Sequence, residues 1–359
     1  MGPDGNLWFL DGFTNRTGHG PGAIGRITPA GTITLFSKGL QGPGGPTDLV
    51  AGPDGDLWFT SAAPSAIGRI TPSGTVTLFS RGLPTSGWVS DIVSGPDGNL
   101  WFTDSSVPGA VGGAIGRVTS SGTISLFTKG LPPGGNQGHL VKGPGGDLWF
   151  TDYSKGGAGT GSIGRITPSG VITMFSGGPL AGTDPTALVP GPGGELWFSG
   201  QTNNLTWIMG RITEAGAITL IHSGFPSRFG TGVVFGPGGV VWLIGYDPVN
   251  LSGAIERITP MRTSSLFSHG LPTLWYPTGF VLGPGGNLWF SEASGNLAMG
   301  PGNGLAAIGR VTSSGVITLF TKGLPPGSEP DNLMVGPGGS LWFLDQSANG
   351  PGAIGRIIP

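Results

Sequence analysis

One motif recurs eight times along the chain, and this repetition limits the possible folds more than any other feature. The motif is Leu-Trp-Phe or a close variant, with its tryptophans 43 to 53 residues apart at Trp8, Trp58, Trp101, Trp149, Trp197, Trp242, Trp289 and Trp342. An Ile-Gly-Arg-Ile/Val motif follows each copy, and a Thr-Ile-Thr-Leu-Phe-Ser element or a variant follows the first seven. A period of this length indicates a repeat architecture.

Each repeat contains four short segments that have the composition of strands. In the second repeat they are strand A at residues 47–50, strand B at 57–60, strand C at 67–71 and strand D at 75–79. They are rich in β-branched and aromatic residues and are bounded by Gly, Pro, Ser and Asp. Four strands per repeat predict an all-β fold, a β-propeller of four-stranded blades.

Composition agrees with a packed fold once the repeat is recognised. The 74 Gly and 33 Pro of the 359 residues suggest disorder when they are considered alone. However, 37% of the residues are hydrophobic, 10% are charged and the net charge is -2, whereas disordered chains are charged and poor in apolar residues. Gly and Pro fall largely in the turns between the strands, so they separate the elements of an ordered repeat.

The number of blades follows from a strand count that leaves two possibilities. The sequence predicts 30 strands, whereas seven four-stranded blades need 28 and eight need 32. We favour seven blades, with residues 32–359 as a single propeller domain and residues 1–31 as an extra B-C hairpin that duplicates residues 336–359. The alternative is eight blades, of which the first lacks strand A and the last lacks strand D.

Charge and cysteine content exclude several classes of partner and chemistry. A net charge of -2 gives no general basic surface for nucleic acid or anionic lipid, so we expect neither as a partner. The absence of cysteine excludes disulfides and thiolate chemistry. The chain contains neither a signal peptide pattern nor an apolar run long enough to span a membrane. Its localisation is therefore open between the cytoplasm and secretion with the signal missing.

The loops of variable length predict where a ligand binds. The B-C and D-A connections vary in length and share one face of the propeller, and loops on a rigid scaffold commonly carry binding residues. The aromatic residues outside the repeat motif fall there, and we predict that they bind a small molecule, glycan or peptide. An equally supported alternative is that they cover neighbouring blades. The candidate aromatic residues are Trp88, Trp207, Trp275, Tyr276 and Tyr153.

Acidic residues form a second candidate group at the same face. One set follows strand B directly and a second set begins the A strands. Such oxygens can bind Mg or Ca, or act as general acids and bases, but they can also cap strand ends. His139 with Asp152 and Tyr153 is the best local group, because one hairpin brings them together. The full set is Asp11, Asp104, Asp152, Glu292 and Asp345 after strand B, and Asp48, Asp91, Asp331 and His139 in strand A.

The segment 95–104, Gly-Pro-Asp-Gly-Asn-Leu-Trp-Phe-Thr-Asp, followed by Ala-Ile-Gly-Arg-Val-Thr-Ser-Ser-Gly at 114–122, resembles the repeat of the virginiamycin B lyase (streptogramin B lyase) family. The resemblance extends over the whole chain. It implies a seven-bladed propeller and a Mg-dependent C-O lyase that opens a cyclic depsipeptide antibiotic by elimination. It also implies catalytic His residues early in late A strands and Glu residues after late B strands.

The positions that correspond to the family's catalytic residues agree only in part. The two Glu positions hold Glu292 and Asp345, whereas the two His positions hold Thr278 and Asp331. His139 lies one residue beyond the corresponding position in another repeat, and a shift by one residue turns a strand side chain to the other face. Our leading expectation is therefore a ligand-binding or interaction module without lyase chemistry.

Two alternatives remain open at this point. The first is a lyase that uses Glu292, Asp345 and His139 as catalytic residues, with Glu292 and Asp345 also as Mg ligands. The second is a structural protein whose terminal hairpins join chains by strand exchange.

Overall fold

The computed structural model describes most of the chain and contains almost only β-structure. The described residues are 1–11, 20–42, 44–84, 87–106, 112–154, 161–204, 206–225, 233–247, 252–259, 263–272, 275–294, 306–325, 327–345 and 352–359. They form 30 strands and five short 3₁₀ helices: η1 (Pro144–Gly146), η2 (Gly178–Leu180), η3 (Pro237–Gly239), η4 (Pro284–Gly286) and η5 (Pro337–Gly339). No helix among these residues has the length and hydropathy needed to cross a membrane.

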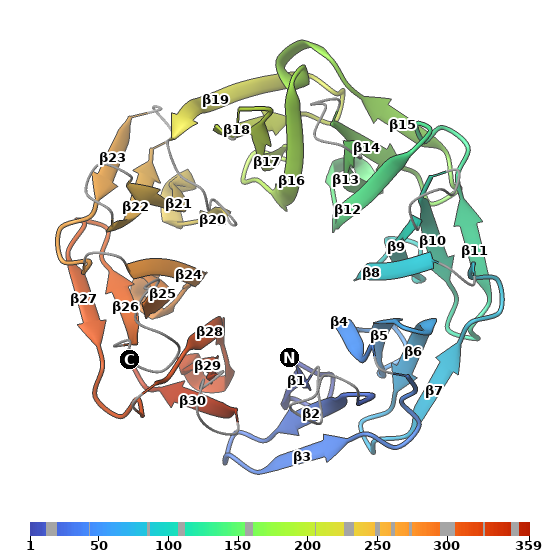
Figure 1. The fold of residues 1–359 in the computed structure, drawn as a ribbon, viewed down its shortest axis with the longest axis horizontal. Coiled ribbons are helices and arrows are strands. Elements are labelled where there is room, and N and C mark those ends of the chain that lie inside the picture. Colours follow the sequence, from blue (N-terminus) through green and yellow to red (C-terminus); the bar gives the residue numbers. More distant parts are fainter. Residues whose placement is uncertain are drawn as a thin grey trace. The chain divides into compact units, whose positions relative to one another are not determined.

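The strands form eight antiparallel sheets, which we call blades 1 to 8, and each blade follows the order of the chain (Figure 1). Blade 1 has β1 (Leu7–Asp11), β2 (Ala23–Ile27) and β3 (Ile33–Phe36). Blade 2 has β4 (Pro46–Ala51), β5 (Leu57–Ala62), β6 (Ser65–Ile70) and β7 (Val76–Phe79). Blade 3 has β8 (Gly87–Ser94), β9 (Leu100–Ser106), β10 (Ala114–Val118) and β11 (Ile124–Phe127). Blade 4 has β12 (Gly135–Lys142), β13 (Leu148–Ser154), β14 (Ser162–Ile166) and β15 (Ile172–Phe175).

The remaining four blades repeat this pattern. Blade 5 has β16 (Thr183–Pro190), β17 (Leu196–Thr202), β18 (Trp207–Ile212) and β19 (Ile218–Phe225). Blade 6 has β20 (Val233–Phe235), β21 (Val241–Asp247), β22 (Ser252–Ile258) and β23 (Ser264–Phe267). Blade 7 has β24 (Trp275–Leu282), β25 (Leu288–Ser294), β26 (Ala307–Val311) and β27 (Ile317–Phe320). Blade 8 has β28 (Pro330–Val335), β29 (Leu341–Asp345) and β30 (Ala353–Ile357).

The fold is a β-propeller with eight blades, so the favoured count of seven is wrong and the alternative is confirmed. Blade 1 lacks strand A and blade 8 lacks strand D. The seven-bladed arrangement needs β3 beside β30, but β3 pairs with β2, with Ile33 opposite Ile27 and Phe36 opposite Ile24. A tight turn joins β2 to β3, in which the Thr28 N–H donates to Thr32 O at 3.0 Å. This local hairpin closes a very short loop, which costs less chain entropy than a long connection.

The chain divides into two compact units. The first unit comprises Met1–Pro190, Gly194–Phe198 and Arg211–Thr219, and the second comprises Gly191–Gly193, Ser199–Gly210 and Leu220–Pro359. Blades 1 to 4 therefore lie in the first unit and blades 6 to 8 in the second, while the strands of blade 5 contribute to both.

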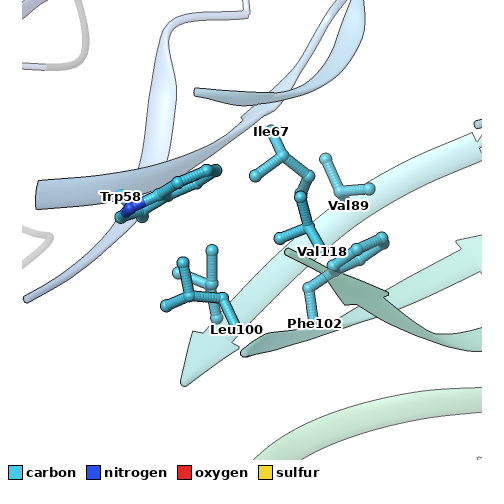
Figure 2. Packing of buried hydrophobic residues seen from close by; sticks show 7 residues of the cluster. Trp58, Ile67, Val89, Leu100, Phe102 and Val118 are labelled. Atoms are coloured by element: carbon cyan, nitrogen blue, oxygen red, sulfur yellow. The ribbon is translucent and has the colours of Figure 1, made fainter. Parts of the chain in front are cut away.

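Within each unit the core consists of a separate hydrophobic cluster at each seam between neighbouring blades. At the seam of blades 2 and 3, Trp58 and Ile67 pack against Leu100, Phe102 and Val118 (Figure 2). In the second unit, the corresponding residues of blades 6 and 7 form a similar cluster. The alternating side chains of strands B and C thus place Trp on one face of a blade and Phe on the other, so each blade covers the next.

The glycine of the Ile-Gly-Arg motif is required by this packing. A Cβ at Gly116 would lie 2.1 Å from Cζ of Phe102, the residue opposite it in strand B. Gly68 and Gly309 have the same relation to Phe59 and Phe290. Blade 6 has neither residue of this Gly–Phe pair. Glu256 stands in place of the glycine, and Leu243 stands opposite it in place of the phenylalanine. The phenyl ring and the missing side chain therefore depend on each other.

The repeated arginine also has a structural role. The Arg117 guanidinium lies 5.5 Å from the ring centroids of Trp101 and of Phe127, and these two rings stack on each other. Its Nη1 donates a hydrogen bond of 3.1 Å to Pro168 O in the next blade. Arg26 makes the equivalent contacts with Trp8, Phe36 and Pro72 O. The arginine thus joins strands B and D of one blade to the C-D turn of the next.

Candidate functional site

A β-bulge lies in the A strand of five blades, at the candidate residues that the sequence places there. In blade 3, Val89 pairs with Asp104 and Ile92 pairs with Phe102, so Ser90 and Asp91 lie opposite one residue of strand B. The same shift of register occurs in β4, β12, β24 and β28. A bulge removes backbone groups from the regular ladder, and these groups then need other partners.

A buried hydroxyl group in strand B satisfies one amide of the bulge. The Asp91 N–H donates to Thr103 Oγ1 at 3.2 Å, and the His139 N–H donates to Thr151 Oγ1 at 3.0 Å. In blade 7 the Gly279 N–H donates to Ser291 Oγ at 2.9 Å. Thr103, Thr151 and Ser291 are all fully buried. Sequence reasoning did not single out these residues, although a Ser or Thr before the acidic position is visible in most repeats.

The candidate residues Asp48, Asp91 and His139 accept backbone amides of the A strand in the following blade. The Ile92 N–H donates to Asp48 Oδ2 at 2.9 Å, and the Leu140 N–H donates to Asp91 Oδ2 at 2.9 Å. These carboxylates therefore bond backbone amides across a seam between blades.

His139 makes the third contact of this kind, because the Leu188 N–H donates to its Nδ1 at 3.1 Å. A neutral imidazole that accepts at Nδ1 carries its proton on Nε2, so the other ring nitrogen is a donor. In this arrangement His139 has no ring nitrogen available to act as a general base. Among the described residues, Asp152 bonds Gln137, Ser162 and the Asn136 N–H and not His139.

The aspartates after strand B close their own hairpins. Asp104 accepts the Trp88 N–H at 3.1 Å, and Asp345 accepts the Glu329 N–H at 2.8 Å and the Ser328 hydroxyl at 2.7 Å. Burial raises the pKa of Asp104, and the bond from Trp88 opposes this effect. Asp11 ends β1 and is half-buried. The bonds of Asp104 and Asp345 are structural, as expected for side chains that cap strand ends.

Asp152 occupies the same position in blade 4, but its hydrogen-bond partners include two polar side chains, those of Gln137 and Ser162. It accepts bonds of 3.2 Å from Gln137 Nε2 and from Ser162 Oγ, and all three residues are buried. Burial raises the pKa of Asp152 to about 6, although the bonds from Ser162, the Asn136 N–H and Gln137 lower it. Gln137 and Ser162 were not among the sequence candidates. No periodic pattern identifies them, because other repeats hold different residues there.

Glu292 differs from the aspartates at its position. It pairs with Pro277 across the hairpin of blade 7 and its exposed fraction is 0%. Among the described residues neither carboxyl oxygen has a hydrogen-bond partner, whereas Asp104 and Asp345 accept amides of their own hairpins. Burial raises the pKa of Glu292 to about 8, so the carboxyl is protonated at neutral pH. A buried polar group without a partner costs stability, which marks Glu292 as a candidate functional residue.

Asp331, at one of the family's His positions, directly precedes the bulge of β28. A Cβ at Gly279 would lie 3.5 Å from Asp331 Oδ1 and 3.2 Å from the Asn332 nitrogen. Asp331 Oδ1 accepts the Asn332 N–H at 2.7 Å, and Asn332 has a positive φ of 51°. The backbones of Thr278 and Asp331 thus lie in facing A strands. The side chain of Thr278 lies outside the described residues.

Two aromatic candidates expose large apolar surfaces in the first unit. Trp88, in β8, is 55% exposed, and Tyr153, in β13 of the next blade, is 37% exposed. Tyr153 lies over the bulge, because a Cβ at Gly138 would lie 3.1 Å from its ring. Trp207 begins β18 and is half-buried. The side chains of Trp275 and Tyr276 lie outside the described residues.

The predicted magnesium ligands do not fit such an ion. Mg²⁺ is bound by an octahedral set of oxygens that includes one or two carboxylates with free lone pairs. Both oxygens of Asp345 already accept hydrogen bonds, and Glu292 is buried and protonated at neutral pH. In the part of the chain that the structure describes, no three His, Asp or Glu side chains converge as metal ligands.

Fold and sequence together define a class of protein: an all-β propeller whose A and B strands carry most of the described candidate residues. The family described as the virginiamycin B lyase family matches residues 1–136 and 110–357. The chain belongs to this family. No curated protein matches it.

Solved structures of the same family are similar to this chain. Virginiamycin B lyase from Staphylococcus aureus is 27% identical, with 88% of this chain and 96% of that chain covered and a TM-score of 0.60. A catalytically inactive histidine-to-alanine variant of that enzyme with quinupristin is 26% identical, with 98% and 100% covered and a TM-score of 0.61. A streptogramin B lyase is 25% identical, with 87% and 93% covered and a TM-score of 0.58.

Proposed function

We propose that this protein binds a cyclic peptide of the streptogramin B type through the face formed by its A strands and variable loops, without opening the ring. The observation that carries the proposal is the exposure of Trp88 and Tyr153 on neighbouring blades, at 55% and 37%. Large exposed aromatic side chains on a rigid scaffold are typical of binding surfaces. A relative of this chain contains quinupristin, which suggests the class of ligand.

The residues at the family's catalytic positions argue against turnover. An elimination needs a base, and the two His positions hold Thr278 and Asp331. His139 does not replace them, because its Nδ1 accepts the Leu188 N–H. A relative with a histidine changed to alanine is described as catalytically inactive while it holds quinupristin, so loss of a histidine is compatible with retained binding.

The experiment is a titration of the purified chain with quinupristin by isothermal calorimetry, with mass spectrometry of the ligand afterwards. We expect binding, an unchanged ligand mass and an intact ring. Trp88→Ala and Tyr153→Ala should each weaken binding by about 10-fold or more, as for aromatic residues at the centre of an interface. Val171→Ala is the control, because Val171 is 60% exposed but lies in the C-D turn. Absence of binding, or equal effects of all three variants, contradicts the proposal.

A second candidate function, ring opening by elimination, rests on Glu292. The carboxyl is buried, has no hydrogen-bond partner in the part of the chain that the structure describes, and is protonated at neutral pH, which suits a group that donates a proton to a leaving oxygen. Ring-opened quinupristin in the incubation, abolished by Glu292→Gln, would favour this function over binding alone. Ring opening that persists in Glu292→Gln would assign the chemistry to other residues.

A further inference from the structure

Three consecutive seams of the first unit share one device. At each seam a backbone N–H in the A strand of one blade donates to a side chain in the A strand of the preceding blade. The acceptors are Asp48 for Ile92, Asp91 for Leu140 and His139 for Leu188, at 2.9, 2.9 and 3.1 Å. Ile92, Leu140 and Leu188 are buried, so water does not readily replace a lost partner.

The third seam differs from the other two in the chemistry of its acceptor. A carboxylate accepts hydrogen bonds throughout the neutral and mildly acidic range. An imidazole accepts at Nδ1 only while it is neutral, because both ring nitrogens of the imidazolium carry protons. Protonation of His139 would therefore bring two N–H groups against each other at Leu188, and a buried amide without an acceptor costs about 1–3 kcal/mol.

The charges around His139 favour a second position for the imidazolium. The titratable groups on the strands packed against β12 are Asp91 on β8, Asp104 on β9, Asp152 and Tyr153 on β13, and Asp184 on β16. Burial raises the pKa of Asp91, and the Leu140 N–H and the charge of His139 both lower it. Asp91 and His139 thus attract each other, while none of these groups on the described strands is cationic. Lys142 is the cation of β12 itself, at the other end of the strand.

We propose that the protonation state of His139 controls the contact between the A strands of blades 4 and 5. The neutral side chain holds the Leu188 N–H of β16. The protonated side chain releases this amide and turns toward the Asp91 carboxylate on β8. Acidification therefore loosens β16 from β12, while the seams held by Asp48 and Asp91 remain closed.

The test is hydrogen exchange, followed by mass spectrometry of overlapping peptides that isolate the Leu188 amide. Protection is compared at about pH 7.5 and about pH 5.5, on either side of the range in which imidazoles titrate, after correction for the intrinsic exchange rate. For the native chain we expect protection of Leu188 to fall about 10-fold or more at the lower pH, as expected when a buried bond is lost. Protection of Ile92 and Leu140 should not change.

The chain itself supplies the matched variant. His139→Asp places at the third seam the acceptor used at the other two, and it should keep Leu188 protected at both pH values. His139→Ala should leave Leu188 weakly protected at both. Asp152→Asn removes the neighbouring carboxyl with a pKa of about 6 and should leave the pH effect unchanged.

Two outcomes overturn the proposal. The first is equal protection of Leu188 in the native chain at both pH values. The second is a pH effect that persists in His139→Asp or disappears in Asp152→Asn. If His139→Ala does not fold, the comparison of the native chain with His139→Asp still decides whether the contact at Leu188 depends on the protonation of His139 or is independent of pH.

Discussion

Replacing Gly116 by alanine tests the mutual dependence of glycine and phenylalanine in each blade. The new Cβ would lie 2.1 Å from Cζ of Phe102, whereas non-bonded carbons approach to about 3.5 Å, so the ring must move by about 1.5 Å. Phe102 is fully buried in the cluster that contains Trp58 and Val89 and has no space into which to move. Overpacking of this kind costs about 3 kcal/mol, near the upper end of its usual range.

A second substitution, Phe102→Leu, should offset most of the stability lost in Gly116→Ala, because blade 6 already combines Leu243 with a residue larger than glycine. Phe102→Leu alone removes buried carbons and should cost about 1.5 kcal/mol. Independent effects would then add to about 4.5 kcal/mol, but we expect about 2.5 kcal/mol for the double variant, a coupling of about 2 kcal/mol.

The assay is equilibrium unfolding in guanidinium chloride, followed by both circular dichroism and tryptophan fluorescence. Both probes are needed because the chain divides into two compact units and its unfolding is not assumed to be a single transition. Only the transition that includes blade 3 should shift to lower denaturant. A coupling below about 0.5 kcal/mol, the usual error of additivity, would refute the reasoning, because it would mean that the ring and the glycine do not constrain each other.

Three further predictions each concern a single residue. Glu292 has a folded-state pKa of about 8, above its ordinary value of 4.5, so the folded chain keeps a proton that the unfolded chain loses between these two values. The contribution of this carboxyl to the free energy of unfolding is therefore fully present below about pH 4.5 and is lost as the pH rises to about 8. Glu292→Gln should abolish that part of the decline in melting temperature, and an unchanged profile would exclude a protonated Glu292. Thr151→Val removes the acceptor of the His139 N–H and should lower the free energy of unfolding by about 2 kcal/mol, measured by denaturant titration; a loss below about 0.5 kcal/mol would mean that water replaces the hydroxyl. Arg117→Lys keeps the charge but loses the planar stack between Trp101 and Phe127, so the same titration should report a loss of about 1 kcal/mol, whereas equal stability would reduce the contact to a simple charge effect.

The repeat predicted the architecture because each blade is encoded locally. Hairpin turns and alternating strands specify the four-stranded unit, and the predicted number of 30 strands agrees with the described structure. The preference for seven blades failed because the hairpin of β1 and β2 is identical in strand sequence to that of β29 and β30. Sequence alone therefore gave β3 two equivalent partners, and only the short turn from Thr28 to Thr32 decides between them.

The candidate site was predicted less completely, because its chemistry depends on contacts between repeats. The sequence places Asp104, Asp152, Glu292 and Asp345 at one position of the blade. Which of them has a structural partner depends on the preceding A strand and on the length of the side chain. Glu292 is one methylene longer than its counterparts and has no hydrogen-bond partner among the described residues, a difference that spacing cannot reveal. The contact of His139 with Leu188 joins residues that are 49 positions apart in the sequence, and no sequence motif indicates it.

The repeated packing of tryptophan also gives the protein an optical property. Trp58, Trp101, Trp149, Trp242 and Trp289 are almost completely buried, and four of them stack on a phenylalanine ring. Indoles in such dry surroundings emit at short wavelengths, whereas Trp88 is 55% exposed and emits in contact with water. Emission collected at the long-wavelength side of the band should therefore be weighted toward Trp88. The native protein thus carries its own reporter for a molecule that arrives at this surface, without any added label.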